Sequence, residues 1–468
     1  MISQLWLSEI AQVTGGILQG EDASFSNVST DTRTLAAGDL FVALSGENFD
    51  GNSFAEVAAN KGATGALVSR FCSVDLPQVR VPDTLKALGQ LAVLNRSKFT
   101  GALVGITGSS GKTTVKEMTA SILAQCGSVT YTKGNLNNHI GVPLTLLNID
   151  KSHRYAVVEM GASAVGEIAY TTSLARPDVV IINNAGDAHL QGFGSRENIV
   201  IAKGEIISGL TDAGTAILNA DDIAYEAWQK MASGKQIISF GFKGQRKADV
   251  TATNIIVKES GTSCELKTKS GATEINLGVS GEHNVANALA AASAALALQI
   301  DLATIKKGLE LFSSVKGRLH RQNLGSMIVI DDTYNANPAS VKAGLAVLSA
   351  ESGVKLAVLG DMAELGAECD ALHESVGRFA AEQKIDYLFV VGAHALSVAK
   401  GFGVTGAGIG AGVYASKREL LTALAAKIKE LAINSAGTKP VVYVKGSRSA
   451  RMEEITQQLL QWSMEAAC

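Results

Sequence analysis

One short segment constrains the fold of this chain more than any other. The apolar residues 102–104 are followed by the run Gly105-Ile106-Thr107-Gly108-Ser109-Ser110-Gly111-Lys112-Thr113-Thr114. An apolar strand ending in a glycine-rich turn, with a lysine and a hydroxyl opening the next helix, is typical of a polyphosphate-binding loop. Backbone N–H groups and the helix N-terminus would surround the anion, Lys112 would reach the outer phosphates, and Thr113 could ligate Mg²⁺. The usual spacing places a glycine at Ile106, so the motif is compressed to Gly-x-x-Gly-Lys-Thr.

The rest of the chain alternates short apolar stretches with helix-length segments, which predicts an α/β fold. Its 468 residues suggest about three domains. We expect a small N-terminal α/β domain over residues 1–82, a linker helix within 83–99, a central domain over 100–315 and a second large α/β domain over 316–468. The central alternation predicts a mostly parallel sheet covered on both faces. Residues 249–280 alternate apolar and polar side chains, which predicts antiparallel strands appended to that sheet.

Composition excludes several classes of protein. The net charge of −3 argues against a nucleic-acid-binding protein. The five cysteines show no C-x-x-C spacing, which favours reduced thiols and a cytoplasmic location. The first residues lack the pattern of a signal peptide, and the Ala-rich segment 286–300 is too short and polar to span a membrane. The glycines at 406, 408, 410 and 412 do not fit a dinucleotide-binding pattern, and we expect them in a flexible loop.

Polar residues follow two of the predicted central strands. Glu159 closes the apolar stretch 155–159, and the carboxyl ends of parallel strands are where α/β sheets bind ligands. Glu159 would hold Mg²⁺ there through its oxygens, or it is an ordinary surface acid. His189 comes after the strand 179–182 and two asparagines. A histidine in that place is either structural or part of a polar site, and the neighbouring asparagines favour a site.

Lys203 is the most unusual candidate. It lies in a predicted helix over about residues 197–210, in the middle of an apolar face formed by Ile199, Ala202, Ile206, Ile207 and Leu210. Burying an ammonium group is costly and would lower the pKa of the lysine. A neutral amine can capture CO₂ as a carbamate and so become a carboxylate-like metal ligand. The alternative is a lysine whose head reaches the surface.

Three further places carry residue types that suit nucleotide binding. Asn284, at the start of the Ala-rich helix, would read a purine edge or cap the helix. Arg318 lies at the predicted hinge between the two large domains, from which a guanidinium could reach a transferring phosphate. The segment 331–338, which follows the first strand of the last domain, is rich in Asp, Asn and Tyr side chains.

At this point the sequence resembles one family, the Mur ligases, along its whole length. The compressed phosphate loop is a feature of that family, and the segments 334–338 and 360–366 resemble the member that adds a D-alanyl-D-alanine unit. The segments that carry the resemblance are 30–33, 38–44, 107–114, 134–138, 140–143, 188–190, 202–206, 283–284, 332–338, 359–366 and 445–448.

The resemblance implies a fold and a reaction. It implies three domains, the last of them Rossmann-like, which bind a UDP-sugar substrate, ATP and an incoming amine in that order. ATP would phosphorylate the terminal carboxylate of UDP-N-acetylmuramoyl-tripeptide. The amine of D-alanyl-D-alanine would then attack the acyl phosphate through a tetrahedral intermediate. The partners implied are therefore small molecules, and we expect a monomer.

The resemblance also implies roles for individual residues. Lys112 and the loop amides would hold the phosphates, Thr113 and Glu159 one Mg²⁺, and His189 with carbamylated Lys203 a second Mg²⁺. Asn284 and Asp332 would contact adenine and ribose, and Arg318 the γ-phosphate. The residues expected to act in catalysis are Lys112, His189, Lys203 and Arg318. Substrate contacts are expected from Thr30, Asp31, Thr32, Arg33, Asn137, Asn138, Tyr334, Asn335, Asn337, Lys445, Ser447 and Arg448.

Two positions depart from the family pattern, and two alternatives for the function remain. Asn52 stands where relatives often carry His, and Gln191 stands where an acidic residue is common. A P-loop nucleotide switch would need Asn-Lys-x-Asp, but the one Asn-Lys pair, at 60–61, precedes the phosphate loop and is followed by Gly-Ala. A nearer alternative is another ATP-dependent amino-acid ligase, such as a folylpolyglutamate synthase.

Overall fold

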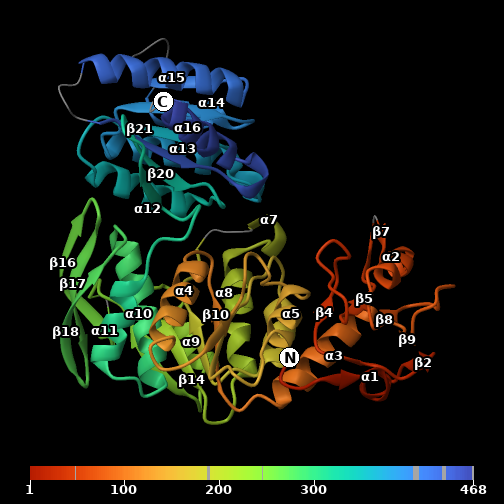
Figure 1. Ribbon diagram of the computed structural model, residues 1–468. Coiled ribbons are helices and arrows are strands. Elements are labelled where there is room, and N and C mark those ends of the chain that lie inside the picture. Colours follow the sequence, from red (N-terminus) through yellow and green to blue (C-terminus); the bar gives the residue numbers. More distant parts are fainter. Residues whose placement is uncertain (48, 187–189, 245, 404–409, 435–438, 466–468) are drawn as a thin grey trace.

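The computed structural model describes residues 1–47, 49–186, 190–244, 246–403, 410–434 and 439–465. Three α/β units follow one another along the chain (Figure 1). The N-terminal unit, in red, lies beside the central unit, and the C-terminal unit, in blue, lies above the central one. The α/β fold expected from the sequence is thus confirmed. No helix among the described residues combines the length and the apolar character that crossing a membrane requires.

The central unit is built on a six-stranded sheet in the order β11-β12-β10-β13-β14-β15, and every neighbouring pair is parallel. Alternate residues of the strands face two separate cores. Val157 and Ile181 pack with α4 and α10, and Val158 and Ile182 with α6 and α8. The strands are β10 (Ala102–Thr107), β11 (Val129–Tyr131), β12 (Tyr155–Glu159), β13 (Val179–Ile182), β14 (Thr215–Asn219) and β15 (Gln236–Phe240). The helices named are α4 (Lys112–Leu123), α6 (Glu167–Ala175), α8 (Arg196–Gly204) and α10 (Glu282–Ala297).

The antiparallel strands expected within 249–280 form a sheet of their own. β16 (Thr251–Lys258), β17 (Gly261–Thr268) and β18 (Gly271–Leu277) pair in that order. A bridge between Phe240 and Val250 links the segment to the end of β15. The buried side chains of this sheet join the core on the α10 side of the large sheet, together with α11 (Leu302–Leu311).

The N-terminal unit has a five-stranded sheet in the order β2-β9-β8-β5-β4, in which only β2 runs antiparallel to its neighbour. Its strands are β2 (Ile17–Gln19), β4 (Val28–Ser29), β5 (Leu40–Val42), β8 (Gly65–Val68) and β9 (Gln78–Arg80). The helix α3 (Thr84–Ser97) packs into the core that the unit shares with the central sheet. Its buried Asn95 donates to the backbone oxygens of Leu146 and Ile149 and accepts from the N–H of Ile2. The connecting helix therefore ties the two units together.

The C-terminal unit has a six-stranded sheet in the order β19-β20-β24-β21-β22-β23, parallel except for β19. Its strands are β19 (His320–Asn323), β20 (Ile328–Asp332), β21 (Lys355–Leu359), β22 (Tyr387–Val391), β23 (Ala411–Tyr414) and β24 (Val441–Lys445). Helices α12 (Pro338–Ala350), α13 (Cys369–Glu382) and α14 (Ala395–Gly401) flank one face, and α15 (Lys417–Asn434) and α16 (Glu453–Glu465) the other. The expected loop at the four glycines is wrong at Gly412, which lies in the edge strand β23, and positions 406 and 408 lie outside the described residues.

Candidate functional site

A cavity of about 1350 Å³ lies where the central and C-terminal units meet. The carboxyl ends of β10, β12 and β13 open onto it from one side, and those of β20 and β24 from the other. Parallel strands place polar loop residues at this edge of a sheet, so two such edges face one another across the cavity. Lining residues from the phosphate loop are Ser109, Ser110, Gly111, Lys112, Thr113 and Thr114.

The phosphate loop connects β10 to α4 as the sequence predicts. Ile106 is a fully buried strand residue that pairs with Glu159 and Ile181, which is why no glycine is needed there. Gly111 precedes the helix with φ +77°. A Cβ atom on it would lie 2.5 Å from side-chain atoms of both Asn183 and Asn287, so a larger residue does not fit.

Not every predicted loop residue reaches the cavity. Thr107 is fully buried and its hydroxyl donates to the backbone oxygen of Met160 at 2.8 Å. Gly108 is also absent from the described lining, and its backbone oxygen accepts a hydrogen bond from Nζ of Lys112 at 2.6 Å. Burial lowers the pKa of Lys112, and the nearby Glu159 raises it.

Amide side chains hold the loop from behind. Asn184 Oδ1 accepts the N–H of Ser110 at 2.9 Å, and Asn183 Nδ2 donates to the backbone oxygen of Ser110 at 2.9 Å and to Asn287 Oδ1 at 3.0 Å. These bonds fix the loop before any ligand binds. The position of the two asparagines behind strand 179–182 was the sequence signal for this contact.

Glu159 and Thr113 lie in direct contact. The Thr113 hydroxyl donates to Glu159 Oε2 at 3.0 Å, and Asn137 Nδ2 donates to Oε1 at 2.8 Å. Only 2% of Glu159 is exposed, so the surface alternative for this acid is wrong. A buried carboxylate beside a hydroxyl offers the oxygen ligands that Mg²⁺ prefers, and the pair fits such an ion.

Arg318 reaches the phosphate loop from the segment between the two large units. Its Nη2 lies 3.4 Å from Thr113 Oγ1, and its guanidinium packs over the ring of Tyr334 at 4.0 Å from the centroid. The structure thus brings Arg318, Thr113 and Glu159 together in one wall of the cavity.

The two residues expected to contact adenine and ribose are already engaged within the protein. Asn284 donates to the backbone oxygen of Ser280 at 2.8 Å and accepts from Asn287 at 3.2 Å. Asp332 is buried and paired with Lys445. The alternative in which Asn284 caps the helix is wrong, because Gly281 is the N-cap of α10 and no side chain caps its first turn. Both Asn284 and Asp332 line the cavity.

Lys203 is buried, with 2% of its surface exposed. The helix around it is α8 followed by a 3₁₀ segment (Glu205–Gly209), and Nζ lies 5.1 Å from the centroid of the Phe193 ring. The alternative of a surface-reaching lysine is therefore wrong. Burial, and then the positive charge of Lys112, lower the pKa of Lys203 to about 7. Lys203 is not among the described residues that line the cavity, and His189 lies outside the described residues.

The predicted substrate residues fall into two groups. Thr30, Asp31, Thr32 and Arg33 lie in the N-terminal unit and do not line the cavity, and Asp31 and Arg33 form an ion pair at 2.6 Å. The others line the cavity: Asn137, Asn138, Tyr334, Asn335, Asn337, Lys445, Ser447 and Arg448. Several of these also shape the backbone, because Asn138 accepts the N–H of Gly141 and Asn337 caps α12.

Of the two departures from the family pattern, Asn52 has a local explanation in this chain, and nothing in the described contacts explains the Gln191 side chain. Asn52 is buried and bonds to Asp50 Oδ1 at 2.6 Å and to Ser69 Oγ at 2.8 Å, so it holds two loops of the N-terminal unit together. Gln191 donates its backbone N–H to the oxygen of Glu364 at 3.2 Å, a contact between the central and C-terminal units.

Sequence reasoning missed several parts of the lining, among them the segment at the carboxyl end of β14. Asn219, Asp221 and Asp222 line the cavity, and Asp222 Oδ2 accepts the N–H of Ala185 at 2.9 Å. The available signal was the run Asn-Ala-Asp-Asp directly after a buried strand, the same pattern that marked Glu159.

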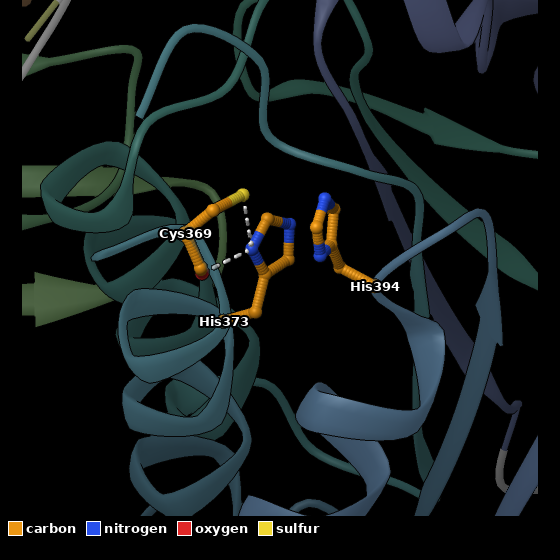
Figure 2. Close-up of side chains that lie close together, drawn as sticks. All are labelled: Cys369, His373 and His394. Atoms are coloured by element: carbon orange, nitrogen blue, oxygen red, sulfur yellow. Dashed lines mark hydrogen bonds between the residues drawn. The ribbon is translucent and has the colours of Figure 1, made fainter. Parts of the chain in front are cut away.

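A cluster of Cys369, His373 and His394 lies apart from the cavity lining (Figure 2). The two rings stack at 4.7 Å, and Cys369 Sγ lies 3.5 Å from His373 Nδ1. However, His373 Nδ1 donates to the backbone oxygen of Cys369 at 2.8 Å, and Nε2 accepts the N–H of Met362 at 2.9 Å. Both ring nitrogens are thus committed to the backbone, so His373 is a structural residue.

We expect His373→Ala to lower the free energy of unfolding by about 3 kcal/mol, because the buried backbone N–H of Met362 loses its acceptor and a void remains. Chemical denaturation checks this, with His394→Ala as the control. His394 is partly exposed, and its loss is expected to cost about 1 kcal/mol or less. Equal losses in the two variants would contradict the assignment.

Comparisons with known proteins give consistent results. Three family models match: "Mur ligase family, catalytic domain" at residues 24–96, "Mur ligase middle domain" at 106–295 and "Mur ligase, glutamate ligase domain" at 317–448. The UDP-N-acetylmuramoyl-tripeptide–D-alanyl-D-alanine ligase of Escherichia coli is 45% identical over 97% of this chain and 98% of its own length. A crystal structure of MurF from Acinetobacter baumannii has 37% identity and a TM-score of 0.91, covering 98% of this chain and 99% of that one. The MurF ligase of Thermotoga maritima in complex with ADP has 26% identity and a TM-score of 0.80, covering 94% and 98%.

Proposed function

The chain belongs to the Mur ligase family, and on that premise we propose that it joins D-alanyl-D-alanine to UDP-N-acetylmuramoyl-tripeptide at the expense of ATP. The near full-length similarity to a ligase of that name supports the substrates. One observation of the structure carries the proposal: Arg318 lies 3.4 Å from Thr113 of the phosphate loop, in a cavity that residues of two α/β units line together. A carboxylate, an ATP γ-phosphate and an amine can meet in such a cavity.

The chemistry assigns separate tasks to the two sides of the cavity. Lys112, the loop N–H groups and Arg318 would bind the phosphates and stabilise the charge that develops during transfer to the substrate carboxylate. The amine would enter from the side of Tyr334, Asn335 and Arg448. Closure of the cavity by the C-terminal unit would keep water away from the acyl phosphate.

Metal ions complete the proposed site. Thr113 and Glu159 would hold one Mg²⁺, and His189 with carbamylated Lys203 a second. Bound Mg²⁺ would supply positive charge that lets an anionic carboxylate approach an anionic phosphate. The buried position of Lys203 and its pKa of about 7 support the carbamate, because they leave a substantial fraction of the amine neutral at physiological pH.

The proposed substrates are tested by ADP release from the purified chain. We expect turnover only when ATP, Mg²⁺, UDP-N-acetylmuramoyl-tripeptide and D-alanyl-D-alanine are all present, with the UDP-muramoyl-pentapeptide as product by mass spectrometry. ADP release that depends instead on folate and glutamate would overturn the proposal in favour of a folylpolyglutamate synthase.

A second test concerns the metal. Glu159→Gln is expected to raise the Mg²⁺ concentration for half-maximal turnover about tenfold, because a neutral amide replaces a charged ligand. Mg²⁺ titration after treatment with a chelator checks this, and Glu226→Gln, at an exposed acid on the helix α9 (Tyr225–Met231), serves as the control. An unchanged Mg²⁺ requirement in Glu159→Gln would remove this residue from the metal site.

A further inference from the structure

A buried ion pair lies at the carboxyl ends of β20 and β24. Lys445 Nζ lies 2.5 Å from Asp332 Oδ2, and the hydroxyl of Tyr443 donates to the same oxygen at 3.1 Å. Lys445 is 2% exposed and Asp332 is 6% exposed. A pair so deeply buried gives little net stability, because desolvation offsets the attraction between the charges. Its geometry therefore calls for another explanation.

The second carboxylate oxygen of Asp332 supplies an explanation for this geometry. Oδ1 accepts the backbone N–H of Leu319 at 3.2 Å, the residue directly after Arg318. The backbone on both sides of Arg318 is left-handed, with φ +76° at Gly317 and φ +50° at Leu319. The left-handed region is costly for a residue such as leucine, so an external contact must hold this turn. Asp332 provides that contact on the C-terminal side of Arg318. On the N-terminal side, the backbone N–H of Tyr334 donates to the backbone oxygen of Gly317 at 3.2 Å.

The turn presents Arg318 to the phosphate loop. The guanidinium packs over Tyr334 and reaches Thr113 Oγ1 at 3.4 Å. A chain of contacts thus runs from Lys445 to Asp332, from Asp332 to the turn at Leu319, and from the turn to the phosphate site.

We propose that Lys445 and Asp332 are positioning residues that hold the turn at 317–319 and so aim Arg318 at the terminal phosphate of the bound nucleotide. This inference rests on the proposed function. It differs from the roles expected from the sequence, in which Lys445 contacts substrate and Asp332 contacts ribose. Without Lys445, the Asp332 carboxylate would be a buried unpaired charge, and it would protonate or turn away from Leu319.

A double-mutant cycle tests the proposal. Titration calorimetry measures the affinity of the Mg²⁺-containing protein for AMP-PNP and for ADP, and the ratio of the two affinities reports recognition of the terminal phosphate. We expect Lys445→Met to lower this ratio about tenfold, which is the change in affinity that follows the loss of one charge-assisted hydrogen bond. Arg318→Ala should lower it at least as much. In the Arg318→Ala background, Lys445→Met should cause no further loss of the affinity ratio, because the effects of substituting two residues that act as one unit are not additive.

Either of two calorimetric results with Lys445→Met would overturn the proposal. One is an unchanged affinity ratio in Lys445→Met, and the other is an equal loss in the presence and absence of Arg318. In the turnover assay, a raised KM for D-alanyl-D-alanine with unchanged kcat would assign Lys445 to substrate binding instead. The calorimetric experiment needs neither the tripeptide nor the dipeptide, so its outcome is separate from the test of the proposed substrates.

Further variants separate positioning from a loss of folding. Tyr443→Phe removes a single hydroxyl from Asp332 and keeps the core filled, so we expect a smaller loss of the affinity ratio in the same direction. Arg321→Met breaks another ion pair of the same unit, Arg321–Glu351 at 3.1 Å, which does not contact the turn. This control is expected to lower thermal stability and leave the affinity ratio unchanged, and a lowered ratio here would also overturn the proposal.

Discussion

Replacing Lys112 by methionine is expected to lower kcat about a thousandfold, the size of effect that follows the loss of one preorganised charge in an active site. Lys112 opens α4 from the phosphate loop, and its Nζ is held 2.6 Å from the oxygen of Gly108. Methionine keeps the length of the side chain and removes the charge. The remaining loop N–H groups would still bind phosphate, so the loss should fall on the transfer step more than on nucleotide affinity.

Steady-state ADP release at saturating substrates measures this effect. Lys307→Met is the matched control, because Lys307 is an exposed lysine on α11 and is expected to leave kcat unchanged. Thermal unfolding of both variants verifies the fold. A kcat for Lys112→Met within tenfold of the parent protein would show that the lysine does not take part in phosphoryl transfer.

Lys203→Met is expected to reduce turnover by a similar factor and at the same time to stabilise the fold. Turnover should fall because the proposed carbamate ligand cannot form. Stability should rise by about 2 kcal/mol in buffer free of CO₂ and Mg²⁺, because methionine fills the same buried volume without a charge. Such a gain on removal of a functional group is typical of residues retained for activity.

The pH dependence of that stability gain follows from the lowered pKa. Lys203 has a pKa of about 7 in the folded chain and an ordinary value of 10.5 when unfolded. Between these values the unfolded chain binds more protons, so the free energy of unfolding of the parent protein rises with pH. The advantage of Lys203→Met should therefore be largest below about pH 7 and shrink toward pH 10.

Bicarbonate gives a second measurement on the same residue. Carbamate formation needs the neutral amine, so the activity of the parent protein should fall below pH 7 and recover partly when bicarbonate is added. The Lys203→Met variant should not respond to bicarbonate. A fully active Lys203→Met protein would contradict the carbamate, and so would an unmodified parent lysine in a structure with bound nucleotide and Mg²⁺.

Local sequence patterns were sufficient for many of the elements and for one half of the site. An apolar run followed by Gly111-Lys112-Thr113 predicts strand, loop and helix, because the required backbone conformations are set by neighbouring residues. The strand-end position of Glu159 and the apolar helix face around Lys203 marked both residues as candidates, but each left a surface alternative open, and the structure decided for burial. The edge strand β23 escaped prediction because glycines interrupt its pattern.

The other half of the site depends on contacts between residues far apart in the chain. The sequence by itself determined which residue types were available: a phosphate loop, a strand-end acid, a lysine on an apolar face and an arginine at a hinge. Only the tertiary structure decided that Arg318 lies against Thr113 and that Lys445 pairs with Asp332. The reason is physical: periodicity reports which face of an element is buried, whereas the partner of a buried charge depends on strand order and on how distant segments of the chain pack.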